Sequence, residues 1–420
     1  MSTYPINQYF KLYYTKLIAA SLVIGFLAAL LGISLKHLTE HYEEILYSRA
    51  IANSVWIIVF PAFGLSLIYI LRQYLFKKKE NKGIKEVFDA TDANGNRLPA
   101  YKVPSHFING LLTVIFGGST GVEVSTVVAT ATIGSVTSEK SFLQKYRTEL
   151  ICAGVVGGIT ALFNTPLAGL FFAYEVVSKK LHKEQIICNL TAAGIAFGFV
   201  LILDEAPLFG VNITHWNVYA LPWFVLLGII AGLNSLYLTK SVLFFKKQFL
   251  KFTSAQYKIL VGAVSISIMV LLLPQLYGEG YHAIKESIIS ANKMVLTPYI
   301  AFTLIGILLL KPIITSVTLG AGGDGGVFAP GIFLGAFLGL FVAILLNTFF
   351  DAGVIPLNFM VAGMAAMLSA SIHAPLTALF LVCGLTNNYT LFVPLIVVSF
   401  VAKYTAQYVF PYTVYSFAKK

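Results

Sequence analysis

One carboxylate, Glu123, stands among uncharged residues in the segment 117–125 (GGSTGVEVS) of a strongly apolar chain. A lone acid without a basic neighbour is costly to bury in a membrane, so it calls for a functional explanation. The three glycines allow a tight turn, and a helix starting near Val124 would direct its positive end at this turn. Such a segment can hold an anion without a cation. The alternative is a glycine-rich helix cap in which Glu123 only complements the helix dipole.

The elements that must position this segment are membrane helices. The 420 residues are 57% hydrophobic and 11% charged, with a mean hydropathy of +0.81, which is too apolar for a soluble globule. Residues 18–35 contain no charge and are long enough to cross a bilayer. Similar apolar stretches recur at residues 54–76, 186–203, 259–273, 299–310 and 327–346. We therefore expect an all-α polytopic membrane protein.

The net charge of +11 lies mainly between the apolar stretches. By the positive-inside rule, the basic clusters at residues 77–79, 179–183 and 246–251 face the cytoplasm, and the last two lysines put the C-terminus there too. The polar and aromatic residues 1–16 are expected at the cytoplasmic interface. We interpret the charge as membrane topology with both termini cytoplasmic, and not as a nucleic-acid site.

The sequence gives little support for a metal site or for an enzyme. Cys152, Cys188 and Cys383 lie in apolar segments without metal-ligand spacing, so we expect small buried hydrophobes and no metal or cofactor. A membrane enzyme that uses Glu123 as acid or base is an alternative. No Ser–His–Asp arrangement accompanies Glu123, so we expect no catalytic residues and favour transport.

Two segments repeat at a constant offset of 209 residues (362 − 153). Residues 153–175 and 362–384 share an initial Ala-Gly and a proline at the same position. A glycine-rich break precedes each segment, at residues 117–125 and at residues 320–330 (GAGGDGGVFAP). Two halves with corresponding breaks indicate a transporter or channel built from inverted repeats, with its substrate site where the breaks meet.

At this point the chain resembles the CLC family of chloride channels and chloride/proton exchangers, from about residue 18 to residue 416. Residues 326–330 (GVFAP) fit the family's G-x-F-x-P motif. Residues 121–125 (GVEVS) fit its G-[RK]-E-G-P motif at the glycine and the glutamate, and residues 386–391 (TNNYTL) resemble its T-x-N-Y segment. The resemblance implies two inverted-topology repeats of broken and tilted helices, and a homodimer with one anion pathway per subunit.

On this resemblance we divide the chain into an N-terminal interfacial segment, residues 1–16, and a CLC transmembrane domain, residues 17–420. The first repeat is expected at about 17–205, the second at about 218–411, and a C-terminal inner-gate helix at 412–420. No regulatory CBS domain is expected. The protein would be a multi-pass protein of the plasma or inner membrane, surrounded by lipid.

The resemblance also assigns roles to individual residues. Glu123 would be the outer gate, whose carboxylate takes the place of the anion and swings out when protonated. Tyr415 would be the inner gate and offer its hydroxyl to the same ion. The anion-binding positions would be Lys82, Gly83, Ile84, Gly121, Val327, Phe328, Ala329 and Tyr415. The alternatives are ordinary aromatic core for Phe328 and an interfacial tyrosine for Tyr415.

The chain departs from the family's first motif, G-S-G-I-P, at residues 81–85 (NKGIK). Only Gly83 and Ile84 are kept, and Lys82 stands where the family has an anion-coordinating serine. One interpretation puts a full positive charge beside the pathway. The other extends the cytoplasmic lysine cluster and lets Lys82 reach water. Both interpretations stay open.

A second departure concerns protons. The family's exchangers carry an inner proton-accepting glutamate just after the PLAG helix. Here Glu175 keeps the first acidic position, but the proton-carrying position is Val176, as in the channel branch. Glu175 could replace it if the alignment shifts by one residue.

The third departure is Ser125, which stands for the motif's proline and resembles the fluoride-exporting branch. Phe328 and Tyr415 argue against that branch. We therefore expect transport of chloride or a similar monovalent anion, channel-like or weakly proton-coupled. The alternative is a chloride/proton antiporter that takes protons as a second substrate, and a fluoride/proton antiporter ranks lower.

Further polar residues sit near the breaks. Lys311, in an apolar run, either adds positive potential to the pathway or pairs at a helix break. Asp324 would repel anions in the pathway, so we expect it to face the vestibule. Asn164 and His373 are equivalent by the offset of 209 (373 − 164), and we expect them to shape the turn before a proline.

Overall fold

The computed structural model describes residues 6–417, apart from residues 80, 93–94, 141 and 181. The expected interfacial segment 1–16 and inner-gate helix 412–420 therefore lie partly outside the described residues, and Lys419 and Lys420 lie wholly outside them. Within the described part, the chain forms helices and a single isolated β-bridge. Nine helices of this part are long and apolar enough to cross a membrane.

The helices fall into two series of corresponding order. The first series is α1 (Ile6–Ala52), α2 (Val55–Ile70), α3 (Lys85–Thr91), α4 (Lys102–Ile115), α5 (Glu123–Thr137), α6 (Arg147–Phe163), α7 (Pro166–Phe172) and α8 (Lys183–Ile202). The second is α9 (Leu221–Phe249), α10 (Ala255–Leu272), α11 (Tyr281–Ser290), α12 (Pro298–Gly320), α13 (Phe328–Phe350), α14 (Pro356–Ile372), α15 (Pro375–Thr386) and α16 (Phe392–Val409). The short helix α17 (Val414–Phe417) follows.

Each expected apolar crossing lies in a helix, but the helices at 18–35 and 299–310 are longer than expected, because α1 runs from Ile6 to Ala52 and α12 from Pro298 to Gly320. The crossing at 54–76 is α2, continued by a π-helical turn at Leu71–Leu75. Helix α3 starts at Lys85. Helix α4 begins at Lys102 and takes Pro104 into its first turn, where proline removes no helical hydrogen bond. At 14 residues, α4 is short for a membrane crossing.

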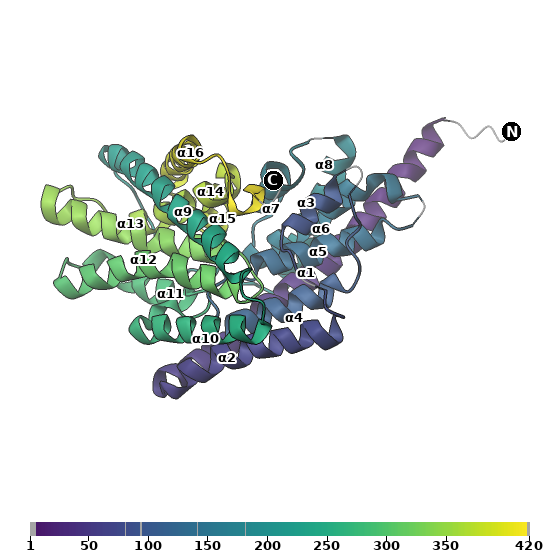
Figure 1. Ribbon diagram of the computed structural model, residues 1–420. Coiled ribbons are helices and arrows are strands. Elements are labelled where there is room, and N and C mark those ends of the chain that lie inside the picture. The colour runs from purple at the N-terminus through teal and green to yellow at the C-terminus, as the bar shows by residue number, and fades with distance from the viewer. Residues whose placement is uncertain (1–5, 80, 93–94, 141, 181, 418–420) are drawn as a thin grey trace.

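Most helices of the first series lie on one side of the molecule and most of the second series on the other, whereas α2 lies beneath α10 along the lower edge of Figure 1. Contacts between the two series join α2 to α10, α7 to α15 and α5 to α13. Helices that lie in corresponding positions of the two series therefore pack on one another, as inverted repeats predict.

The internal repeat is visible in the backbone. Helices α6 and α14 each have 17 residues and each end at a residue in the left-handed conformation. These residues are Asn164, with φ of 56°, and His373, with φ of 57°. A proline begins the next helix two residues later in both halves, so the expected turn role of Asn164 and His373 is confirmed.

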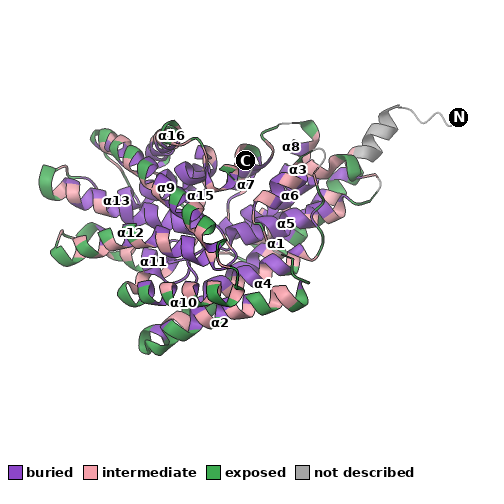
Figure 2. Ribbon diagram, in the orientation of Figure 1, coloured by how far each residue is buried: buried purple, intermediate pink, exposed green. Residues whose placement is uncertain are grey.

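The pattern of buried and exposed residues is typical of a membrane domain. Helices α13 and α14 are almost wholly buried at the centre, whereas α2 and α10 expose apolar side chains along the edge seen in Figure 2. An exposed apolar edge of this kind is suited to lipid. The three cysteines are buried and free of disulfides, as expected.

Candidate anion pathway

The two glycine-rich breaks lie side by side. Gly121 and Gly326 form an antiparallel bridge, in which each backbone N–H donates to the other residue's carbonyl, at 3.3 and 3.2 Å. Helices α5 and α13 begin two residues after these glycines, at Glu123 and Phe328. The N-termini of the two helices therefore converge at one buried place, where their N–H groups favour an anion.

The carboxylate of Glu123 lies over this place. Its side chain is 1% exposed, and Oε1 accepts a hydrogen bond from the Tyr281 hydroxyl at 2.6 Å. Oε2 has no hydrogen-bond partner among the described residues. A Cβ atom at Gly121 would overlap Oε2, so only glycine leaves room for the folded-back carboxylate. The backbone of Ala329, at the start of α13, also faces this carboxylate.

Tyr415 approaches the same bridge from α17. It is buried, and its hydroxyl has no hydrogen-bond partner in the described part of the chain. A Cβ atom at Gly326 would lie 3.1 Å from this hydroxyl, which puts the oxygen directly against the break. The ring centre of Tyr415 lies 6.4 Å from that of Phe328. Val327 and Ala329, on either side of Phe328, are buried.

The segment 81–85 reaches the break with its backbone and not with the lysine. Gly83 has a φ of 63°, and its Cα faces the Val124 side chain of α5. Ile84 is buried, whereas the Lys82 side chain is exposed. Lys82 and Tyr415 both line a cavity of about 820 Å³, which we call the large cavity. The Lys82 ammonium thus lies in this wide space and not in the buried site.

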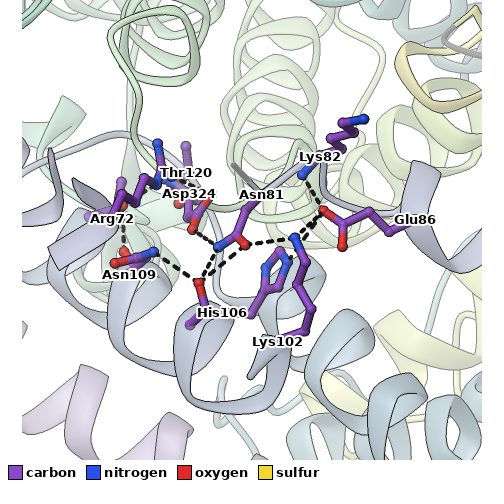
Figure 3. A network of polar contacts seen from close by, with 11 residues as sticks. Arg72, Asn81, Lys82, Glu86, Lys102, His106, Asn109, Thr120 and Asp324 are labelled. Carbon is purple, nitrogen blue, oxygen red and sulfur yellow. Dashed lines mark hydrogen bonds and ion pairs between the residues drawn. The ribbon is translucent and has the colours of Figure 1, made fainter. Parts of the chain in front are cut away.

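Two ion pairs stand beside the large cavity, linked by Asn81 (Figure 3). Arg72 pairs with Asp324 at 2.8 Å, and Lys102 pairs with Glu86 at 2.9 Å. The Asn81 amide donates to Asp324 at 2.5 Å and accepts from Lys102 at 3.2 Å. Asp324 does line this cavity, as expected, but its charge is compensated.

Neither position of the expected proton path, Glu175 or Val176, lines the large cavity. Glu175, in the π-helical turn Ala173–Ser178, accepts from the backbone N–H groups of Leu376 and Thr377, at 3.2 and 2.8 Å. The Thr377 hydroxyl donates to the same carboxylate at 2.8 Å. Glu175 therefore caps the start of α15 in the other repeat, and Val176 is buried in the core.

Residues on the other side of Glu123 were not singled out from the sequence. Glu279, from the segment before α11, accepts a hydrogen bond from the backbone N–H of Val122 at 2.9 Å. Its own N–H donates to the Glu43 carboxylate at 3.1 Å. The sequence does contain a signal for Glu279, because it is a single acid between two glycines. Glu123 is likewise a single acid that follows glycines. Glu43 is a buried residue of α1.

The contacts of Lys311 agree with pairing at a helix break, the second of its two expected roles. It is fully buried, and its Nζ donates to the carbonyls of Gly278 and Glu279 at 3.1 and 3.2 Å. It also lies over the Phe333 ring, 4.3 Å from the centroid. Lys311 thus satisfies backbone carbonyls before α11, as a buried ammonium requires.

One known family matches most of the chain. The profile of the family described as "voltage gated chloride channel" matches residues 63–407. The chain belongs to this CLC family. Its all-α fold of inverted repeats is the CLC fold, and the protein is a multi-pass membrane protein.

Similar proteins come from several bacteria. The H(+)/Cl(-) exchange transporter ClcA of Vibrio cholerae serotype O1 is 27% identical over 416 residues, covering 94% of this chain and 87% of that protein. The protein of the same name from Citrobacter koseri is 27% identical over 409 residues, covering 92% and 84%. Both relatives are named as transporters and not as enzymes, which agrees with transport for this CLC protein.

Solved structures share the fold. A slow cyanobacterial Cl-/H+ antiporter superposes with a TM-score of 0.83 at 21% identity, covering 99% of this chain and 98% of that one. A CLC-type fluoride/proton antiporter superposes with a TM-score of 0.81 at 23% identity, covering 97% and 98%. At these identities the likeness concerns the fold alone.

Proposed function

We propose that this CLC protein carries chloride, or a similar small monovalent anion, across the membrane, with Glu123 as one gate and Tyr415 as the other. The observation that carries the proposal is the bridge between Gly121 and Gly326, which brings two helix N-termini to one buried point. The Glu123 carboxylate and the Tyr415 hydroxyl approach that point from two different directions.

The gating follows from competition. A carboxylate and a chloride ion both bind the same N–H donors. A protonated carboxyl group has no charge and binds these donors more weakly, so the anion can replace it. Backbone groups at Gly121, Val327, Phe328 and Ala329 would form most of the anion site, with Gly83 and Ile84 beside it. Lys82 would act from the large cavity by attracting anions, without binding them directly.

The mode of transport that we favour is channel-like or weakly proton-coupled. Val176 cannot carry a proton, and Glu175 uses both carboxylate oxygens to cap α15. Full chloride/proton antiport is the second candidate, because the bacterial relatives are named as exchangers. Fluoride/proton antiport ranks third; the buried Ser125 hydroxyl favours it, whereas Phe328 and Tyr415 oppose it.

The assembly and topology that we propose follow the family. The large cavity would face the cytoplasm, with both termini on that side of a plasma or inner membrane. The repeats would span about residues 17–205 and 218–411, after an interfacial segment at 1–16 and before an inner-gate helix at 412–420. Two subunits would form a homodimer with one pathway each.

The deciding experiment is reconstitution of the purified protein in liposomes with a chloride gradient, while external chloride and pH are recorded. Chloride flux without proton movement supports the channel-like mode. Uphill proton movement that Glu123→Gln abolishes would establish antiport instead. Faster flux of fluoride than of chloride would favour the third candidate, and protein that moves none of these ions would overturn the proposal.

A further inference from the structure

Glu279 occupies a donor at the start of α5 that an anion would otherwise use. Its buried carboxylate, in a side chain 4% exposed, accepts the N–H of Val122, the residue directly before Glu123. Backbone N–H groups at a helix start are the donors that hold anions in the proposed function. The carboxylate of Glu279 therefore competes for this helix end in the same way as that of Glu123.

The two carboxylates share one small space. Glu123, Glu279 and Tyr281 line a pocket of about 20 Å³, which we call the small pocket. This volume is enough for about one water molecule. The small pocket has no lining residue in common with the large cavity. The small pocket and the large cavity therefore lie on different sides of the gate.

The charged neighbours that act on Glu279 are mostly acids. Glu43 and Glu40 of α1, together with Glu123, are close enough to repel Glu279 electrostatically. Lys311 of α12 is close enough to attract both Glu43 and Glu279 electrostatically. Its Nζ donates to backbone carbonyls, and within the described residues it forms no ion pair with either acid.

Lys36 of α1 also lines the small pocket, but it is paired with Glu205 at 3.0 Å. His37 donates to the same Glu205 carboxylate at 2.7 Å. Glu123 and Glu279 line one buried pocket and repel each other, so they do not both ionise freely and their charge states are coupled.

We propose that Glu279 is a second gating carboxylate, which holds the Val122 donor when the pathway is closed. It must leave this donor, or lose its charge, before an anion passes between the small pocket and the site at Gly121. This inference rests on the proposed function, in which Glu123 is the first gate. Glu279 acts by excluding the anion and by setting the charge state of Glu123.

The test combines chloride binding with the pH dependence of flux. Chloride affinity is measured by calorimetry in detergent for Glu123→Gln alone and for Glu123→Gln with Glu279→Gln. Glutamine keeps an oxygen acceptor for the Val122 N–H, so the second change removes mainly the charge. The matched control is Glu43→Gln in the same background, because Glu43 accepts from the backbone N–H of Glu279 and does not line the small pocket. Size-exclusion chromatography checks that each variant is folded.

We expect Glu279→Gln to tighten chloride binding by about threefold or more, and Glu43→Gln to change it by less than about twofold. In the protein with Glu123 intact, Glu279→Gln should move the half-maximal pH of chloride flux about one unit lower, because Glu123 loses a negative neighbour. Unchanged affinity and pH profile, or equal effects of both substitutions, would overturn the inference. If Glu123→Gln itself neither binds chloride nor alters flux, the proposed function fails instead.

Discussion

The large cavity and the small pocket differ in how their charges are compensated. Beside the large cavity, the acids Asp324 and Glu86 each have a cation within 3 Å, at 2.8 and 2.9 Å. In the small pocket, Glu123 and Glu279 are held by a hydroxyl and by a backbone N–H. Ion pairs fix the acids beside the large cavity, whereas neutral donors hold Glu123 and Glu279. Under the proposed function, the carboxylates that an anion displaces are these two of the small pocket.

The largest effect should come from breaking a pair beside the large cavity. Arg72→Ala leaves Asp324 buried without its cation, and we expect a loss of about 3 kcal/mol of stability. Thermal unfolding in detergent checks this. The double variant Arg72→Ala with Asp324→Asn removes both charges and should recover most of the loss; equal melting of the single variant and the wild type would show that the pair is not structural.

Removing the proposed gate, Glu123, should have the next largest effect. This effect should be on chloride flux and not on stability. Glu123→Ala frees the N–H groups near Gly121, so chloride flux should rise about tenfold and lose its pH dependence. Liposome efflux followed with a chloride electrode at several pH values measures both. Glu139→Ala is the control for loss of an acid, because Glu139 is exposed and lines neither pocket. Flux that keeps its pH dependence in Glu123→Ala would contradict the gate.

A smaller change on the same side tests the hydroxyl contact. Tyr281→Phe removes the 2.6 Å hydrogen bond to Glu123 and keeps the ring. A hydrogen bond to a charged group is worth about 1.5 kcal/mol or more, part of which the mobile carboxylate regains from water, so we expect flux to rise about threefold. Tyr277→Phe serves as the control, because its hydroxyl donates to the carbonyl of Ile115 and not to an acid. Reduced flux in Tyr281→Phe would refute a restraining role.

The smallest effect is expected at Lys82. Because its ammonium is exposed in the large cavity, Lys82→Ser should weaken chloride affinity by less than about threefold, and the difference should vanish at high salt. Calorimetry at two ionic strengths measures this, with Lys85→Ser as the neighbouring control. A loss of affinity that persists at high salt would put Lys82 in direct contact with the anion.

The amino-acid sequence by itself determined the membrane class, the helix spans and the internal repeat. These depend on local quantities: the run length of apolar residues, the positions of glycine and proline, and a constant offset along the chain. The equivalence of Asn164 and His373 was available in this way, because a turn before proline is a local conformation. The two glycine-rich breaks were equally visible as a pair.

Only the tertiary structure decided which polar groups meet at the breaks. Glu279 lies 157 residues from Val122, and Asp324 lies 252 residues (324 − 72) from Arg72, so neither contact leaves a spacing in the sequence. The same holds for Glu175, whose capping of α15 joins the two repeats. An acid's role depends on whether a cation, a hydroxyl or a helix N-terminus lies beside it, and packing between distant helices determines that.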